Sequence, residues 1–363
     1  NFWFMSRSNA LKVRHLTKET LDCTSVSFEV SVEDAEAFAF LPGQYLTLRT
    51  EIEGEDVRRS YSLCTAPSEG DLRVAVKHIP GGLFSGFVHE DLKVGDTLDV
   101  MPPMGRFTPK LDATQRRNYV GIAAGSGITP IMSIMKTALE TEPESTFTLL
   151  YGNRFASSVI FKEQIEGLKN QYLERLRVFH FMSREVPDIP LFSGRLSGEK
   201  IDQCLLHLID GASIDGWYIC GPEAMTTEIR DTLEQQGVAK DRVHFELFTA
   251  AKSNGKRRKV QAAATGPERI SEVHIKDGGN SFAFNMPLGS QPVLDAALER
   301  GADLPFACKG GVCCTCKAKL IEGKVEMEVN YALEPEEVEA GYILSCQAIP
   351  LSEKIVVDFD EAL

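Results

Sequence analysis

The 363-residue sequence lacks several features that would assign it to common classes of protein. No apolar run approaches the roughly 18 residues of a membrane-spanning helix, so we expect no membrane contact. The opening residues, Asn1–Met5, are too short for a secretory signal and lack its charged flank. Positive charge is also in deficit, with 39 Lys and Arg against 52 Asp and Glu and a net charge of −13. This balance argues against nucleic acid as a partner.

The remaining composition is that of a multidomain protein. Nine cysteines without a secretory signal suit a reducing compartment, and we expect a cytoplasmic location. The chain is longer than one hydrophobic core usually fills, so two or three domains are expected. Residues 270–363 hold seven Lys or Arg against sixteen Asp or Glu, and therefore carry −9 of the net charge. This acidic region could steer toward a basic protein surface, or its charge could serve solubility alone.

Cysteines near the C-terminus are the most informative feature of the sequence. Cys308, Cys313 and Cys316 have the spacing C-x4-C-x2-C, and Cys346 follows. This spacing is the plant-type signature of a [2Fe–2S] cluster, whose irons select soft thiolate ligands. The glycines at 310 and 311 allow the backbone to turn its N–H groups toward the sulfurs. The sequence therefore predicts that these four cysteines hold the cluster.

Two alternatives concern the same region. Using Cys314 would give the spacing C-x5-C-x1-C, but neighbouring loop residues point apart, so we take Cys314 as a non-ligand. A zinc site or a cluster of buried thiols is the alternative to a [2Fe–2S] cluster. Zinc knuckles favour paired C-x2-C units, and the region contains one such pair.

Three segments and a linker differ in pattern. Residues 10–112 contain short strand-like runs between Pro and Gly turns, which is typical of a small antiparallel β-barrel. Residues 113–248 alternate apolar strands with helices, which predicts an α/β domain with a parallel sheet. Residues 249–268 are a predicted linker, whose basic run Lys256–Lys259 is either a solvated hinge or a binding patch. Residues 269–363 predict a hairpin, a helix, the cysteine loop and a final strand in a small α+β unit.

Two motifs in the first segment together predict a flavin site with its diphosphate. The first runs from Arg59 to Ser62, between two expected strands. It offers a guanidinium for a pyrophosphate, a ring to cover a flavin and a hydroxyl beside the reactive nitrogen. Alone, it could be only an exposed strand edge. In the second, two glycines open a helix whose N-terminal N–H groups can bind an anion, and a serine adds a hydroxyl donor. The predicted residues are Arg59, Ser60, Tyr61, Ser62, Val76, Lys77, His78, Gly81, Gly82, Leu83, Phe84 and Ser85.

Three loops of the second segment predict a pyridine-nucleotide site. Each follows an expected strand, and the carboxyl ends of parallel strands meet at one edge of the sheet. The first loop opens a helix but does not match the strict G-x-G-x-x-G pattern. In another loop Ser183 and Arg184 suit a 2′-phosphate, which favours NADPH over NADH, although Arg184 could be only a surface charge. The predicted residues are Gly125, Ser126, Gly127, Ile128, Thr129, Pro130, Ser183, Arg184, Cys220 and Gly221.

With these motifs assembled, the chain resembles the ferredoxin–NADP reductase superfamily with a C-terminal plant-type ferredoxin. The resemblance rests on the motifs above and on Glu246-Leu247-Phe248, which closes the second segment. It implies FAD as the flavin and a β-grasp fold for the ferredoxin domain. It also implies catalytic roles for Ser62 beside the flavin and Cys220 beside the nicotinamide, with the Phe248 ring over the flavin.

The order flavin, nucleotide, ferredoxin narrows the resemblance further. The runs Ala302–Cys313 and Gly341–Ala348 are similar to those of the reductase subunits of phenylacetyl-CoA epoxidases. This resemblance implies a path from NADPH through FAD and the cluster to a diiron oxygenase component, in phenylacetate degradation. Reductases of Rieske oxygenases or ketosteroid hydroxylases are the nearest alternative. The alternative from another class of protein is a redox-sensing module, whose cluster senses the redox state and does not pass electrons to an acceptor.

Overall fold

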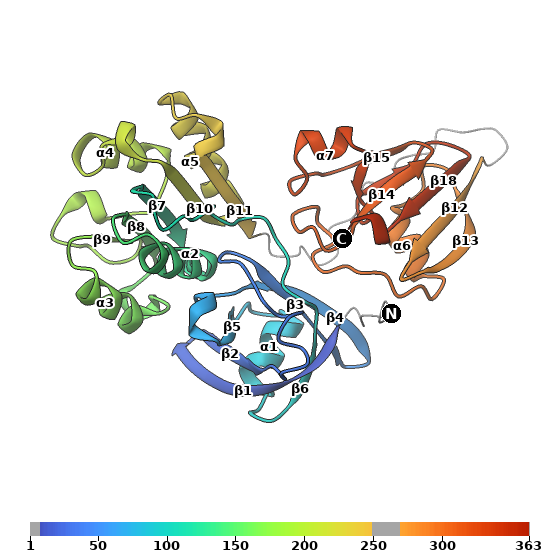
Figure 1. The fold of residues 1–363 in the computed structure, drawn as a ribbon, viewed down its shortest axis with the longest axis horizontal. Helices are drawn as coiled ribbons and strands as arrows, with labels where there is room; N and C mark the ends of the chain where they lie inside the picture. Colours follow the sequence, from blue (N-terminus) through green and yellow to red (C-terminus); the bar gives the residue numbers. More distant parts are fainter. Residues whose placement is uncertain (1–7, 249–268, 363) are drawn as a thin grey trace. The chain divides into compact units, whose positions relative to one another are not determined.

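The computed structural model describes residues 8–248 and 269–362, which fall into two compact units (Figure 1). The expected linker at 249–268 and the N-terminal residues 1–7 lie outside the described residues. Each unit has a hydrophobic core of its own. In the described part of the chain, no helix is long and apolar enough to cross a membrane.

The larger unit begins with a six-stranded antiparallel sheet in the order β4-β3-β6-β1-β2-β5. A bridge between Leu63 and Val74 joins its two edge strands, so the sheet closes into the predicted barrel. Buried side chains such as Val26, Leu48 and Leu98 fill the interior. The elements are β1 (Asn9–Thr20), β2 (Cys23–Glu29), β3 (Tyr45–Ile52), β4 (Glu55–Ser62), β5 (Leu72–Lys77), α1 (Leu83–Glu90) and β6 (Thr97–Val100).

The position predicted for the Arg59–Ser62 motif, between two strands, is wrong. The motif lies on β4, which pairs with β3 along its whole length, from Tyr45 opposite Ser62 to Ile52 opposite Glu55. β4 is mostly polar and does not alternate with period two, so the sequence pattern does not reveal it. The long pairing with β3 makes this segment a strand despite its composition.

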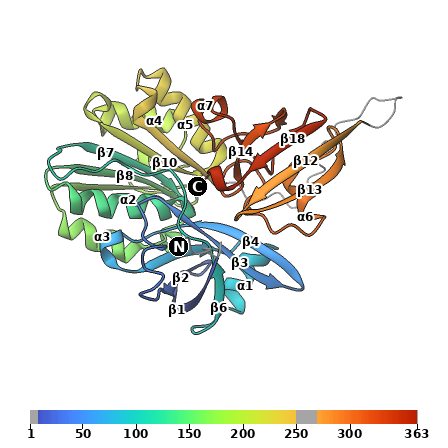
Figure 2. The same cartoon turned by 45° about the vertical axis from the view of Figure 1, so that its right-hand side comes forward.

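The second half of the larger unit is a five-stranded parallel sheet in the order β11-β10-β7-β8-β9. Figure 2 shows α2 and α3 on one face of this sheet and α4 and α5 on the other. Because helices cover both faces of the sheet, β7 and β10 are buried along most of their length. Strands buried on both faces are continuously apolar in sequence. The elements are β7 (Asn118–Ala124), α2 (Ile128–Thr141), β8 (Thr146–Asn153), α3 (Lys162–Gln171), β9 (Leu176–Met182), α4 (Gly198–His207), β10 (Gly216–Pro222), α5 (Glu223–Gln235) and β11 (Val243–Phe248).

Helix α2 also fastens the parallel-sheet domain to the barrel. The buried Ser133 hydroxyl donates to the carbonyl of Thr65 at 2.6 Å. The ammonium of Lys136 pairs with Glu69 at 2.9 Å, with only 9% of the lysine side chain exposed. Both contacts reach the segment that follows β4, so they tie the helix at the glycine loop to the strand that carries the flavin motif.

The C-terminal unit is a five-stranded mixed sheet in the order β13-β12-β18-β14-β16, with a two-stranded sheet of β15 and β17. The predicted hairpin is confirmed, because β12 and β13 pair from Ile270–Pro287 to Asp277–Asn280. The predicted final strand pairs in parallel with β12. The elements are β12 (Ile270–Asp277), β13 (Asn280–Pro287), α6 (Val293–Leu298), β14 (Lys317–Glu322), β15 (Val325–Met327), α7 (Pro335–Glu339), β16 (Tyr342–Leu344), β17 (Ala348–Pro350) and β18 (Lys354–Asp358).

Candidate functional site

Strand β4 presents the flavin motif on both of its faces. Side chains alternate along a strand, so Arg59 and Tyr61 share one face while Ser60 and Ser62 share the other. The guanidinium of Arg59 is half-buried and donates to the carbonyl of Arg58 at 2.7 Å. Ser60 contacts a barrel hydroxyl on β3, and Ser62 is buried. The motif therefore places a cation and an aromatic ring together, with a buried hydroxyl behind them.

The glycine turn before α1 lies next to this face. Gly81 has a φ of +76°, which favours glycine, and Gly82 caps the helix. The N–H of Ile79 donates to the Ser85 hydroxyl at 3.1 Å, so this hydroxyl holds the turn rather than projecting from it. Phe84 is fully buried. The backbone N–H groups at the start of the helix are therefore the donors that the turn provides for a diphosphate.

Residues at the end of β5 connect the flavin motif to the glycine loop of the parallel sheet. The ammonium of Lys77 lies 3.8 Å from where a Cβ on Gly125 would be. Val76 is buried in the barrel core, so only its backbone is available to a ligand. The ring of His78 stacks on His89 with centroids 5.2 Å apart. Lys77 is thus the cation that lies between the two predicted sites.

The two glycine-containing loops of the parallel sheet meet closely. A Cβ on Gly127 would lie 2.2 Å from the carbonyl oxygen of Cys220 and 2.8 Å from the nitrogen of Gly221. No larger residue fits there without moving the backbone. The structure therefore brings together the loop before α2 and the loop after β10, as expected from the topology of a parallel sheet.

The remaining residues of the first loop support the start of α2. The hydroxyl of Thr129 donates to the carbonyl of Ser126 at 2.9 Å. Ile128 and Pro130 are buried. The hydroxyl of Tyr151 donates to the carbonyl of Gly125 at 3.0 Å. These side chains fix the loop, so the backbone is the part that can face a phosphate.

Ser183 and Arg184 follow the end of β9 at the same edge of the sheet. The N–H of Ser183 donates to the carbonyl of Asn153, and that of Arg184 donates to the carbonyl of Arg154. The exposed guanidinium of Arg184 lies 6.0 Å from the centroid of the Phe155 ring. Arg154 is therefore a second arginine at this edge, which the sequence reasoning did not assign to the site. Its position directly after β8 is the signal that could have identified it.

The contact between Ser62 and Glu246 is the main site feature that sequence reasoning missed. The Ser62 hydroxyl donates to Glu246 Oε2 at 3.1 Å, and Cys220 lies opposite Glu246 in the β10–β11 register. Burial raises the pKa of Glu246 to about 7. Burial, together with the charge of Glu246, raises the pKa of the Cys220 thiol well above its usual value. The side chains of Cys220 and Glu246 therefore combine a neutral thiol with a carboxyl that can hold a proton near neutral pH.

Phe248 ends strand β11. It lies opposite Pro222 in the register and packs against the core between the sheet and α2. The residues that follow it lie outside the described part of the chain. Its position at the carboxyl edge of the sheet is compatible with the flavin-covering role, which stays a prediction.

The four predicted cluster ligands lie in the C-terminal unit as two pairs. The sulfurs of Cys308 and Cys313 are 3.0 Å apart, and the side chains of Cys316 and Cys346 hydrogen-bond to each other. A binuclear cluster with four thiolate ligands needs two thiolates for each iron. The arrangement of the donors therefore fits a [2Fe–2S] cluster.

Backbone N–H groups add to the fit. The N–H of Gly310 donates to the sulfur of Cys308 at 3.3 Å. The hydrogen bond from Cys313, together with such backbone donors, lowers the pKa of Cys308 to about 6, which favours the thiolate that metals bind. The sulfur of Cys314 donates instead to the carbonyl of Ala332, which fits the expectation that Cys314 is not a ligand.

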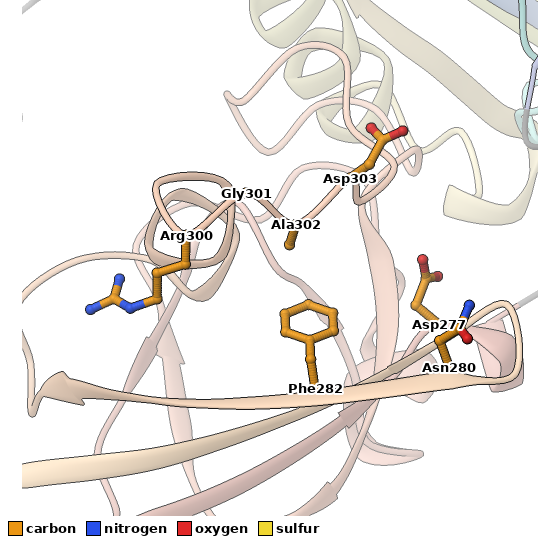
Figure 3. Close-up of a pocket in the computed structure, with 7 residues that line it drawn as sticks. All are labelled: Asp277, Asn280, Phe282, Arg300, Gly301, Ala302 and Asp303. Atoms are coloured by element: carbon orange, nitrogen blue, oxygen red, sulfur yellow. The ribbon is translucent and has the colours of Figure 1, made fainter.

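A separate open pocket of about 420 Å³ also lies in the C-terminal unit (Figure 3). Figure 3 shows Phe282 pointing into it, while the guanidinium of Arg300 points away. That guanidinium is bound to the carbonyls of Ala296 and Asn285. The lining of the pocket contains Asp277 and Asp303 but no cysteine, so this pocket is distinct from the cluster loop.

Comparisons with known proteins agree with this arrangement. The chain matches an oxidoreductase FAD-binding domain at residues 10–108, an oxidoreductase NAD-binding domain at 122–231 and a 2Fe-2S iron-sulfur cluster binding domain at 275–351. It is 43% identical to a subunit of the 1,2-phenylacetyl-CoA epoxidase of Escherichia coli (strain K12), over 98% of this chain and 99% of that protein. The chain belongs to the ferredoxin–NADP reductase superfamily. This superfamily member carries a C-terminal [2Fe–2S] domain, and it binds FAD and NAD(P)H.

Further relatives share the architecture. The ferredoxin reductase component of 3-ketosteroid-9-alpha-monooxygenase from Rhodococcus rhodochrous is 34% identical over 98% of this chain and 97% of that protein. Among solved structures, an intact type IV self-sufficient cytochrome P450 monooxygenase matches with a TM-score of 0.69 and 22% identity, over 96% of this chain and 41% of that chain. Phthalate dioxygenase reductase matches with a TM-score of 0.57 and 23% identity, over 97% and 98%. This member of the ferredoxin–NADP reductase superfamily is thus an NAD(P)H-dependent oxidoreductase of the kind that serves as the reductase component of an oxygenase.

Proposed function

We propose that this reductase passes electrons from NADPH to the diiron component of phenylacetyl-CoA epoxidase, within phenylacetate degradation. The observation that carries the proposal is the 43% identity to a component of that epoxidase over nearly the whole of both chains. The ketosteroid monooxygenase reductase, at 34%, supports the alternative acceptor less strongly. The described residues contain no disulfide, and a cytoplasmic location is part of this proposal.

We infer which residues would hold the cofactors from their positions on the two sheets. Arg59 and the N–H groups at the start of α1 would hold the FAD diphosphate, and Tyr61 would cover the flavin ring. The loops at Gly125–Gly127 and Cys220–Gly221 would hold the nucleotide at the edge of the sheet. When bound, FAD accepts two electrons from NADPH as a hydride, and the [2Fe–2S] cluster passes electrons on singly.

Ser62, Glu246 and Cys220 would determine where protons are held and exchanged at this site. The Ser62 hydroxyl is close enough to Glu246 for the two side chains to exchange a proton. Glu246, with a pKa of about 7, holds that proton over the lower part of the neutral range. The thiol of Cys220 stays protonated, so it adds no charge beside the nicotinamide. Ionised Glu246 would therefore accept, through the Ser62 hydroxyl, a proton released beside the flavin, and this proton neutralises the carboxylate.

Preference for NADPH would rest on the arginine at the end of β9. Arg184 is exposed, and its backbone is hydrogen-bonded to Arg154, which brings a second cation close. Replacing Arg184 with Glu should raise the KM for NADPH about tenfold or more, because a phosphate loses a charged hydrogen bond, while the KM for NADH changes little. Steady-state reduction of cytochrome c with each nucleotide measures the ratio. Lys169→Glu on α3 reverses another exposed charge of this domain and is the control; an unchanged ratio in Arg184→Glu would show that the 2′-phosphate is bound elsewhere.

The acceptor is tested by reconstitution. The holoprotein is mixed with NADPH, phenylacetyl-CoA and the diiron oxygenase component, and the epoxide formed is compared with the NADPH consumed. We expect the two amounts to agree closely. The oxygenase component of the 3-ketosteroid monooxygenase, with its own substrate, is the comparison. Coupled turnover with that oxygenase, and none with the diiron component, would overturn the proposed acceptor.

A further inference from the structure

Lys309, inside the cysteine loop, has an unusual backbone conformation. Its φ is +48°, in the left-handed region that non-glycine residues rarely adopt. The residue stands between Cys308 and Gly310, and two glycines follow it directly. A lysine in this conformation costs free energy relative to glycine, so the surrounding structure must stabilise it.

Three separate segments contact Lys309. Its ammonium donates to Asp295 Oδ1 on α6 at 3.1 Å, and 36% of the lysine side chain is exposed against 16% of the aspartate. The same ammonium lies 4.6 Å from the centroid of the Phe306 ring, which precedes the loop. The side-chain amide of Gln347 donates to the carbonyl of Lys309 at 3.0 Å. Lys309 follows the ligand Cys308 and Gln347 follows the ligand Cys346, so this hydrogen bond links the chain beside the first ligand to the chain beside the last.

The conformation of Lys309 decides where the next peptide groups point. The N–H of Gly310 donates to the sulfur of Cys308 at 3.3 Å. The N–H of Gly311 donates to the sulfur of Cys346. Reduction adds one negative charge to an iron–sulfur cluster, and N–H donors to its sulfurs stabilise that charge. The number and geometry of these donors therefore bear directly on the reduction potential.

We propose that Lys309 is a positioning residue, held by Asp295, Phe306 and Gln347, that orients the N–H groups of the cysteine loop and so raises the reduction potential of the cluster. It acts through the backbone of Gly310 and Gly311. The inference rests on the assignment of the four cysteine ligands. That assignment is tested independently by the serine variant of Cys313 described below.

The test uses the full chain loaded with FAD and cluster. The midpoint potential is measured by a redox titration followed by electron paramagnetic resonance. Lys309→Gly removes the side-chain contacts and permits many backbone conformations. Asp295→Asn removes the ion pair but leaves the loop sequence intact. We expect both variants to lower the midpoint potential and to broaden the signal of the reduced cluster, because the N–H groups are no longer held in one orientation.

Charge alone predicts a different result, which makes the two explanations separable. Removing a nearby carboxylate should by charge alone raise the potential, since the reduced cluster would meet less repulsion. Glu299→Gln is the matched control, because it removes a carboxylate just after α6 that contacts Gln291 rather than Lys309. We expect this control to keep the wild-type line shape. A potential in Asp295→Asn that equals or exceeds the wild-type value, or a Lys309→Gly protein with unchanged potential and line shape, would overturn the proposal. If Lys309→Gly does not retain its cluster, Asp295→Asn alone decides.

Discussion

Glu246 is a carboxyl group that ordinary acidity would leave ionised at neutral pH. Glu246 is half-buried on β11 against Ser62 of the barrel, and the loss of solvation there raises its pKa to about 7 instead. Its hydrogen-bond partner Ser62 is 184 residues away in the sequence. Both residues stand in motifs that the sequence shows, but nothing in either motif indicates that the serine and the carboxyl are in contact. Only the packing of the barrel against the parallel sheet brings them together, so residue patterns could not predict the pair.

Replacing Glu246 with Gln should remove this proton acceptor while keeping the shape of the side chain. We expect electron transfer from the reduced flavin to the cluster, followed by stopped flow, to slow by about 100-fold, the lower end of what a positioned acid–base group contributes. The wild-type rate should rise as the pH rises through about 7, where Glu246 loses its proton and can accept another. The variant should show no such step. The same pH step in Glu246→Gln would mean that another group titrates.

The raised pKa of Glu246 also has a consequence for stability. The folded protein holds this proton up to about pH 7, while the unfolded chain releases it near the ordinary value of 4.5. The folded state therefore binds more protons between these values, and its stability falls as the pH rises through that range. The melting temperature of the wild type, relative to that of Glu246→Gln, should drop from pH 4.5 to 7. A constant difference would contradict the assigned pKa.

Whole elements of the structure follow the sequence patterns more closely than single contacts do. The buried strand β7 and the helix α2 have continuous apolar or helical patterns, and the sequence predicts a strand and a helix in this order. The glycine loop between them was predicted from its place after a strand and before a helix. Strand β4 was not, because its polar residues carry no period-two pattern and its pairing with β3 defines it. Local patterns thus predict elements whose stability comes from burial, and miss those defined by a partner strand.

The contact between the glycine loop and β10 gives a prediction at this scale. Gly127→Ala places a Cβ 2.2 Å from the carbonyl oxygen of Cys220, so the backbone must shift. Such overpacking should cost about 1–3 kcal/mol of stability and raise the KM for NADPH. Gly167→Ala on α3 is the control, because its Cβ meets nothing within 4 Å and should raise stability by up to about 1 kcal/mol. Thermal unfolding measures both. A Gly127→Ala protein as stable as the wild type would show that the loop can adapt.

The cysteine loop gives a second prediction at the scale of an element. Cys313→Ser removes one member of the Cys308–Cys313 pair, so the cluster should be lost and with it the paramagnetic signal of the reduced protein. Reduction of the flavin by NADPH should survive, because this substitution lies in the other compact unit. Cys314→Ser is the control and should keep the signal. An intact signal in Cys313→Ser would refute the ligand assignment.

At the scale of the whole molecule, three domains of different chemistry lie on one chain of net charge −13. Each kind of domain was predicted from a local signature: the cysteine spacing, the strand–glycine–helix order and the short strands of the barrel. The left-handed Lys309 was not, because a backbone conformation leaves no mark on residue spacing, and Arg154 was missed although it directly follows a strand. The sequence thus predicted the kinds of site better than the side chains that tune them.

We propose that electrons from NADPH pass through the flavin to the cluster of the same chain. Anaerobic mixing of the holoprotein with NADPH, followed by visible absorption and by electron paramagnetic resonance of frozen samples, tests it most directly. We expect the flavin band to bleach first and the signal of a reduced [2Fe–2S] cluster then to grow in. We expect Cys313→Ser to show the bleaching alone. A flavin that bleaches completely in the wild-type protein, while the cluster stays oxidised and silent, would contradict the account.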